Sequence, residues 1–200
     1  MDVYPKDFCI LIASHISYEH RIPFLVECLE SLVSQSLSVP IYVSMSFEND
    51  AIKEKTILNV QGNTKIASCQ FIVIVVQNEK TPQMKHFQYL LETIDYKHEW
   101  IMFCDDDDTY EQDRTLNFAY HIQKAKQDEV PGSTLIGLYE GTTEKTHREQ
   151  RHEYWTYCVN RDIMKLFYKN LTPYPNVLKD KCCDVLFAEF LRRSRPEYYF

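Results

Sequence analysis

Four segments in the first part of the chain have the length and pattern of strands. Residues 8–13 and 100–104 have the length and composition of buried strands. Residues 71–76 are of the kind that a parallel sheet buries on both faces. Residues 41–47 alternate apolar and polar side chains, which is the period-two pattern of a strand. The pattern therefore predicts four strands.

Segments with helical periodicity separate these runs. Two of them place apolar residues at helical spacing after an early proline: Leu25, Cys28, Leu29 and Leu32 after Pro23, and Phe87, Leu90, Leu91 and Ile94 after Thr81-Pro82. The polar residues 48–61 predict a further, exposed helix. Strands that alternate with helices at this rhythm predict an α/β fold with a mostly parallel sheet flanked by helices, in a single domain.

The second half of the chain is less regular. The pattern predicts helices over residues 116–125, 162–168 and 184–193, and strands over 135–139 and 155–159. Residues 142–153 are charged and lack apolar periodicity, so we expect a loop that closes as a lid. Residues 194–200 have the composition of a linker or a cut end, which predicts that the chain is one module of a longer protein.

Composition narrows the class of partner. The 200 residues are 44% hydrophobic, enough for a sizeable core, and the formal net charge is −7. No long Lys/Arg block is present, which argues against nucleic acid as the main partner. No apolar stretch is long enough for a membrane span and no signal peptide is evident. We therefore expect a soluble, cytoplasmic protein.

Cysteine and glycine usage exclude several kinds of site. The seven cysteines are irregularly spaced and none forms a CxxC pair, which fits reduced, buried thiols better than disulfides or a zinc site. With only four glycines, the chain lacks a Gly-rich phosphate cradle. Any phosphate must be held by other groups.

The strongest chemical signal is the junction WIMFCDDDDTY, in which four aspartates follow an apolar run directly. Closely spaced like charges repel, so something must neutralise them, and a divalent cation is the favoured candidate. The carboxyl ends of parallel strands are where α/β sheets keep their binding crevice. Carboxylate oxygens suit Mg²⁺ or Mn²⁺. The alternative is a solvated acidic turn.

Several segments, taken in order, resemble the GT-A glycosyltransferases, specifically the inverting family-2-like group. They are ILIASHIS, IYVSMSFEND, VVQNEKTPQMKHFQ, FCDDDD and CCDVLFAEFLRR, from about residue 8 to residue 193. The resemblance implies a metal-dependent enzyme that moves a sugar from a UDP-sugar to a glycan or glycoprotein acceptor. The chain also resembles the glycosyltransferase domains of large algal viruses in its compact size, its missing membrane anchor and its cysteine usage.

The resemblance assigns roles around the aspartates. The DxD motif of the family maps onto Asp105, Asp106 and Asp107, with Asp107 as the direct metal ligand. Asp105 would lie near the ribose or hold metal-bound water, and Asp108 would orient the others. Because the four aspartates are contiguous, a register at Asp106 and Asp108 remains open.

Other residues receive roles by the same resemblance. Ser14 and His15 would line the base pocket, and Glu48 or Asp50 would approach the uracil or ribose. Lys85 would meet a phosphate, although the Lys85-His86 pair departs from the commoner basic-Asn pair of the family.

The resemblance also implies a general base. Asp184 would deprotonate the acceptor hydroxyl, with Asp180 as the fallback, although Cys183-Asp184 stands where the family has Glu-Asp. As an alternative, Asp184 only caps a helix. Basic residues of the charged loop would close over the diphosphate or ligate a metal: His147, Arg148, Arg151 and His152.

Two other functions remain open at this point. The sequence Asp105-x-Asp107-x-Thr109 satisfies the first motif of haloacid-dehalogenase-type phosphatases, with Asp105 as nucleophile and Asp107 as acid/base. That motif normally lies on the opening strand, whereas here three predicted strands precede it. The third possibility is a nucleotide-binding module without turnover.

Overall fold

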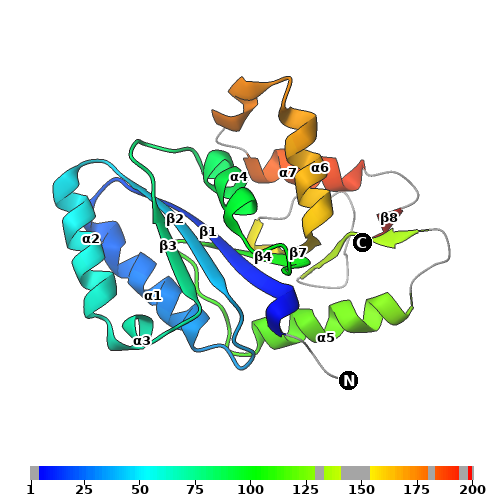
Figure 1. The fold of residues 1–200 in the computed structure, drawn as a ribbon, viewed down its shortest axis with the longest axis horizontal. Helices are drawn as coiled ribbons and strands as arrows, with labels where there is room; N and C mark the ends of the chain where they lie inside the picture. The colour runs from blue at the N-terminus through cyan, green and yellow to red at the C-terminus, as the bar shows by residue number, and fades with distance from the viewer. Residues whose placement is uncertain (1–4, 129–132, 141–153, 180–182, 194–197, 200) are drawn as a thin grey trace.

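The computed structural model describes residues 5–128, 133–140, 154–179, 183–193 and 198–199. Its centre is a six-stranded sheet with the order β3-β2-β1-β4-β7-β6 (Figure 1). The strands are β1 (Phe8–Ile16), β2 (Ile41–Phe47), β3 (Ile72–Val76), β4 (Trp100–Asp105), β6 (Gly137–Tyr139) and β7 (Tyr157–Asn160). The first four are mutually parallel, while β7 is antiparallel to β4 and to β6. The fold is therefore α/β with a mostly parallel sheet, as predicted.

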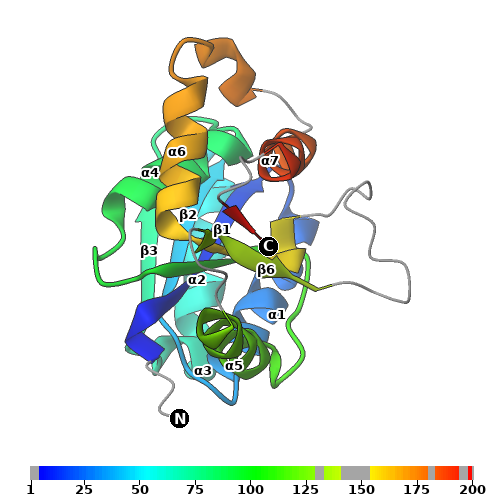
Figure 2. The same cartoon turned by 90° about the vertical axis from the view of Figure 1, so that its right-hand side faces the viewer.

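Helices cover both faces of this sheet, as Figures 1 and 2 show from two directions. One face carries α1 (Ile22–Val33), α2 (Asp50–Gly62), α3 (Thr64–Ala67) and α5 (Arg114–Gln127). The other carries α4 (Gln83–Thr93), α6 (Arg161–Leu171) and α7 (Cys183–Arg192). Short 3-10 turns occur at Pro5–Asp7, Glu19–Arg21, Tyr154–Thr156 and Pro175–Lys179. The sheet thus separates two apolar cores.

The alternation of β1 shows how the two cores form. Its even-numbered residues Ile10, Ile12 and Ile16 pack against the α1 side, whereas Cys9, Leu11 and Ala13 pack against the α4 side. Successive side chains of a strand point to opposite faces, so a continuous apolar run is needed where both faces are covered. The same rule decides which face each polar residue at the end of the strand reaches.

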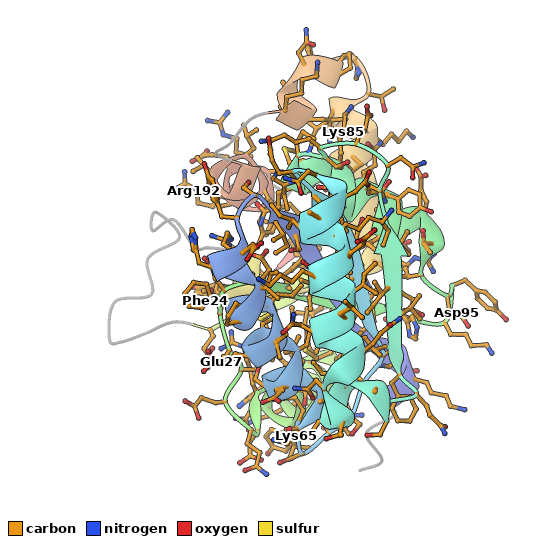
Figure 3. All side chains as sticks on the ribbon, turned by 90° about the vertical axis from the view of Figure 1, so that its left-hand side faces the viewer. Phe24, Glu27, Lys65, Lys85, Asp95 and Arg192 are labelled. Atoms are coloured by element: carbon orange, nitrogen blue, oxygen red, sulfur yellow. The ribbon has the colours of Figure 1, made fainter. Side chains whose placement is uncertain are left out.

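The prediction that residues 71–76 are buried on both faces is wrong. The strand lies at the edge of the sheet, where it pairs only with β2 among the described strands. Val73 is 43% exposed and Ile74 is 37% exposed. Figure 3, which looks at this side of the molecule, shows the strand beside α2 at the margin of the fold. An apolar run reports strand propensity, but it does not distinguish an edge strand from a central one.

Two further predictions need correction. The expected strand over residues 135–139 is two strands in different sheets, β5 (Thr134–Leu135) and β6. Part of the expected linker, β8 (Tyr198–Tyr199), pairs in parallel with β5. The remaining predicted helices and strands are present, with ends shifted by a few residues.

Some sequence predictions concern thiols and a membrane span. Cys9, Cys28, Cys104 and Cys158 are buried, as predicted, whereas Cys69 is only partly buried. Within the described ranges, no helix is both long and apolar enough to cross a bilayer. The charged loop at residues 142–153 lies outside the described residues.

Candidate functional site

Several of the predicted site residues lie at the carboxyl ends of three neighbouring strands. Ser14 and His15 lie near the end of β1, Glu48 follows β2, and Asp105 ends β4. His15 is paired in register with Ser46 of β2, and Ala13 with Asp105. The backbone N–H of Glu48 donates to the carbonyl of Ile16 at 3.1 Å. Because these strands are parallel, residues far apart in sequence share one edge of the sheet.

On the α1 face, Asp106 is held by two donors. The Ser14 hydroxyl donates to Oδ2 at 2.6 Å, and Arg21 Nη2 donates to Oδ1 at 2.8 Å. Asp106 is only 8% exposed. Burial raises the pKa of Asp106, against the lowering effect of the Ser14 hydrogen bond and the charge of Arg21. Its negative charge is therefore neutralised within the protein.

Arg21 also reaches Asp107. Its Nη2 lies 3.3 Å from Asp107 Oδ2, and the Asp107 side chain is 49% exposed. Burial alone would lower the pKa of Arg21, but the charges of Asp106 and Asp107 outweigh it and raise the pKa. One guanidinium thus bridges an inward and an outward carboxylate.

The other two aspartates form the turn itself. The backbone N–H of Asp108 donates to the carbonyl of Asp105 at 3.2 Å, and the side chain of Asp105 accepts from Gln83 Nε2 of α4 at 2.9 Å. Burial, followed by the charge of Asp107, raises the pKa of Asp108. Asp105 and Asp106 have different partners because successive side chains along the strand point to opposite faces of the sheet. Asp105 faces α4, whereas Asp106 faces α1.

The carboxylates of Asp105 and Asp107 fit a hard divalent cation in donor chemistry. Among the described residues, no group of three or more His, Cys, Asp or Glu side chains is arranged to hold a metal. Mg²⁺ bound together with phosphates commonly takes only one or two carboxylates from the protein and fills its other positions with phosphate and water. Two aspartates at a strand end are sufficient for that mode of binding.

On the α4 face, a chain of hydrogen bonds begins at His15. Its Nε2 lies 3.3 Å from Glu48 Oε2, and its Nδ1 lies 2.9 Å from Ser46 Oγ. Ser46 Oγ is 3.1 Å from His86 Nε2, and His86 Nδ1 is 2.7 Å from Ser44 Oγ. Both serines are fully buried, so this polar chain runs from the sheet edge into the interior.

The two ends of this chain differ in their electrostatics. Burial and the nearby His15 lower the pKa of His86 to about 4, against a smaller opposing effect of the Thr81 backbone. At the exposed end, the hydrogen bonds from Lys80 and His15 lower the pKa of Glu48. At neutral pH the chain therefore joins a neutral buried imidazole to a surface carboxylate.

The remaining predicted residues lie on helices or outside the described part of the chain. Lys85 is half-buried in the first turn of α4, and Figure 3 shows it toward the same end of the molecule as Arg192, opposite Lys65. Asp50 opens α2. Asp184 is the second residue of α7, and its side chain lies outside the described part. The predicted residues Asp180, His147, Arg148, Arg151 and His152 also lie outside it.

Sequence reasoning did not identify the residues that surround the aspartates and His15. Arg21 lies outside the quoted segments that resemble the family. Gln83, Ser44 and Ser46 lie inside them but received no role, because each acts through a contact between distant segments. The alternation of residues 41–47 was the one available signal for the two serines. The two serines are buried, because α4 covers the face of the sheet on which they lie.

Comparisons with known proteins agree on the fold. Neither a family model nor a curated protein matches the sequence. The structure of S. aureus TarS 1-349 in complex with UDP is similar with a TM-score of 0.61 and 14% identity, over 93% of this chain and 55% of that one. The mannosyltransferase PcManGT from Pyrobaculum calidifontis, in complex with GDP-Man and Mn²⁺, has a TM-score of 0.53 and 11% identity, over 80% and 46%. The chain has a GT-A-like fold.

Similarity at this level does not select one reaction. A 4-diphosphocytidyl-2C-methyl-D-erythritol synthase from Anaerococcus prevotii matches with a TM-score of 0.50 and 11% identity, over 94% of this chain and 97% of that one. The chain spans about half the length of TarS 1-349. These proteins share the fold, so the fold alone does not identify the reaction of this chain.

Proposed function

We propose that this chain transfers a sugar from a nucleotide sugar, with UDP as the nucleotide, to a hydroxyl of a glycan or glycoprotein acceptor. The observation that carries the proposal is the meeting of Ser14, His15, Glu48 and the acidic turn at one edge of the sheet. The similar solved structures include complexes with UDP, with UDP-GlcNAc, and with GDP-Man and Mn²⁺. In a parallel sheet this edge is also where ligands bind.

The aspartates have different roles in the proposed reaction. Asp107 is exposed and would ligate Mn²⁺ or Mg²⁺, with Asp105 beside it, held in orientation by Gln83. When bound, the cation would stabilise the charge that develops on the departing diphosphate. Asp106 is already paired with Ser14 and Arg21, which supports the register with Asp105 and Asp107 over the one with Asp106 and Asp108.

His15, Glu48 and Lys85 would contact the donor. Ser14, which is buried and bonded to Asp106, would act from beneath the site by holding that carboxylate. The ring of His15 and the carboxylate of Glu48 stand at the exposed end of the polar chain, where a base or ribose can reach them. Lys85 would meet a phosphate from the start of α4. Asp184, at the opening of α7, would take the proton from the acceptor hydroxyl, and a single displacement of this kind inverts the anomeric centre.

Thermal denaturation with nucleotides tests the donor site. UDP with Mn²⁺ should raise the melting temperature more than UDP alone or GDP with Mn²⁺, since a ligand of the native state stabilises it by mass action. Incubation with a panel of UDP-sugars and Mn²⁺ should then release UDP. No shift with any nucleotide would contradict the proposal.

The same assays separate the alternatives. Phosphate release from simple phosphomonoesters would favour the phosphatase reading of Asp105 and Asp107. Binding of UDP without hydrolysis or transfer of any UDP-sugar would favour a module without turnover.

A further inference from the structure

His86 is a buried imidazole with a hydroxyl at each ring nitrogen. It is 1% exposed and lies in α4, which packs over β1 and β2 (Figure 1). Its Nδ1 meets Ser44 Oγ at 2.7 Å, and its Nε2 meets Ser46 Oγ at 3.1 Å. A neutral imidazole has one N–H and one bare nitrogen, so the two contacts must run in opposite directions.

Two fixed donors limit the possible directions. The backbone N–H of Thr81 donates to Ser46 Oγ at 3.3 Å, and Gln77 Nε2 donates to Ser44 Oγ at 3.0 Å. Each serine oxygen therefore already accepts one hydrogen bond. Each also has a single proton to give to a nitrogen.

The carboxylate of Glu48 determines the rest. A carboxylate only accepts, so His15 must direct an N–H from Nε2 toward it. The Nδ1 of a neutral His15 is then bare and takes the proton of Ser46. Ser46 in turn accepts from His86 Nε2–H, and the bare Nδ1 of His86 takes the proton of Ser44. With this order of hydrogen bonds, every donor between Glu48 and Ser44 has an acceptor.

While His15 is neutral, the opposite order is unfavourable at the exposed end. A doubly protonated His15 would instead donate from Nδ1 to Ser46. If Ser46 gave its proton to His86, a neutral His15 would carry its own proton on Nδ1. The bare Nε2 of His15 would then face the carboxylate of Glu48 with no proton between them. The charge on Glu48 thus sets the tautomer of an imidazole that it does not touch.

We propose that His86 is a positioning residue for the nucleoside end of the donor site. From the interior it holds Ser46, and through Ser46 it fixes the ring of His15 with Nε2–H directed at Glu48. The charged or titratable groups along this network are His15 on β1, Glu48 after β2, and Lys80, whose Nζ lies 3.3 Å from Glu48 Oε2. The proposal rests on the proposed function in one respect, namely that His15 and Glu48 meet the nucleoside.

Nitrogen-15 NMR of histidine-labelled protein tests the network without any ligand. At about pH 8.5, well above the ordinary pKa of an imidazole, His86 of the wild type should show a protonated Nε2 and a bare Nδ1. The variant Glu48→Ala removes the acceptor, so a mixture of His86 tautomers is expected. His98 is a second buried histidine, bonded to Tyr42 and to the carbonyl of Lys6, and its signals should not change. A protonated Nδ1 in the wild type, or a His86 tautomer indifferent to Glu48→Ala, would overturn the proposal.

Binding of UDP with Mn²⁺, measured by calorimetry, tests the consequence for the site. His86→Leu should weaken binding about tenfold, which is the usual worth of one well-placed hydrogen bond. His86→Gln should recover most of the affinity, because its amide can donate to Ser46. His98→Leu is the matched control and should bind UDP as the wild type does. Equal affinity of the wild type and His86→Leu would contradict the proposal.

The two experiments fail separately. If the wild type does not bind UDP, the proposed function fails while the NMR result still decides the hydrogen-bond order. If His86→Leu does not fold, the wild-type and Glu48→Ala spectra and the affinity of His86→Gln still decide. A normal affinity of His86→Gln together with a scrambled tautomer in Glu48→Ala supports the proposal.

Discussion

At the scale of single residues, Asp106 and Asp107 share the guanidinium of Arg21 but have opposite surroundings. Asp106 is buried and bonded through both oxygens, whereas Asp107 keeps about half of its side chain in solvent. A buried carboxylate that already accepts two hydrogen bonds is poorly placed to bind a metal. An exposed carboxylate has oxygens that can reach a metal from solvent, and its charge is not destabilised by burial. Substitutions at the two positions should therefore have different effects.

We expect Asp107→Asn to abolish Mn²⁺-dependent UDP binding and to leave the fold intact, because its exposed side chain contributes little to stability. Calorimetry of UDP with and without Mn²⁺ measures the effect, and circular dichroism checks the fold. The control is Asp162→Asn, an exposed aspartate on α6. Unchanged metal-dependent affinity in Asp107→Asn would remove this residue from the site.

Arg21→Leu should act on stability first. Asp106 would stay buried with only the Ser14 hydroxyl as a partner, so the free energy of unfolding should fall by about 1–2 kcal/mol, the partial exposure of Arg21 limiting the loss. Urea denaturation measures this loss. The double variant Arg21→Leu/Asp106→Leu should regain part of it, and a double variant less stable than the single one would argue against the pairing.

The sequence predicted which residues gather at the site better than it predicted their partners. Asp105, Asp106 and Asp107 were found because consecutive charges after an apolar run are rare and physically demanding. Arg21 and Gln83 were not found, because one basic and one amide residue in polar segments have no periodicity to mark them. A bound divalent cation was the favoured way to neutralise the aspartates, whereas for Asp106 the protein itself supplies an arginine.

At the scale of helices and strands, the position of Asp184 admits two roles. It is the second residue of α7, where a carboxylate stabilises the helix by interacting with the helix dipole, even if it has no catalytic role. The helix is anchored by Phe187, whose ring packs against Phe103 of β4 with centroids 6.0 Å apart. This contact ties α7 to the strand that leads into the acidic turn.

Asp184→Asn separates the two roles. Asn cannot accept the proton of the acceptor, so if Asp184 is the base, turnover should fall by about 10²–10⁴-fold with donor affinity nearly unchanged. If the residue only caps the helix, the substitution should be almost silent, since Asn caps as well as Asp. Transfer kinetics and UDP calorimetry are the measurements, and wild-type transfer would shift attention to Asp180.

Periodicity predicted most elements because local spacing is enough to define them. It failed where the outcome depends on neighbours along the sheet. The run at β3 reads like that at β4, yet β3 is an edge strand and β4 lies between β1 and β7. In β2 the polar positions Ser44 and Ser46 are fully buried, because His86 supplies partners from another element.

At the scale of the whole molecule, His86 should make stability depend on pH. The pKa of His86 is about 4 in the folded protein and about 6.5 in the unfolded chain. Between these two pH values the unfolded chain binds a proton at His86 that the folded protein does not bind, which favours unfolding. Stability should be level above pH 6.5 and fall by about 2–3 kcal/mol as the pH drops to 4. Urea denaturation across this range should show a shallower fall in His86→Gln. An equal fall in both proteins would assign the dependence to other groups.

The alternation of β1 has a consequence for how mutations combine. Ser14 and His15 are adjacent in sequence, yet their side chains reach Asp106 and Ser46 on opposite faces of the sheet. Neighbours with no shared partner should be thermodynamically independent, so the stability losses of Ser14→Ala and His15→Ala should add to within about 0.5 kcal/mol. Ser14→Ala and Arg21→Leu, seven positions apart but joined at Asp106, should instead show a coupling energy above that value. In this protein, distance along the backbone is a poorer guide to energetic coupling than the face of the sheet on which a side chain lies.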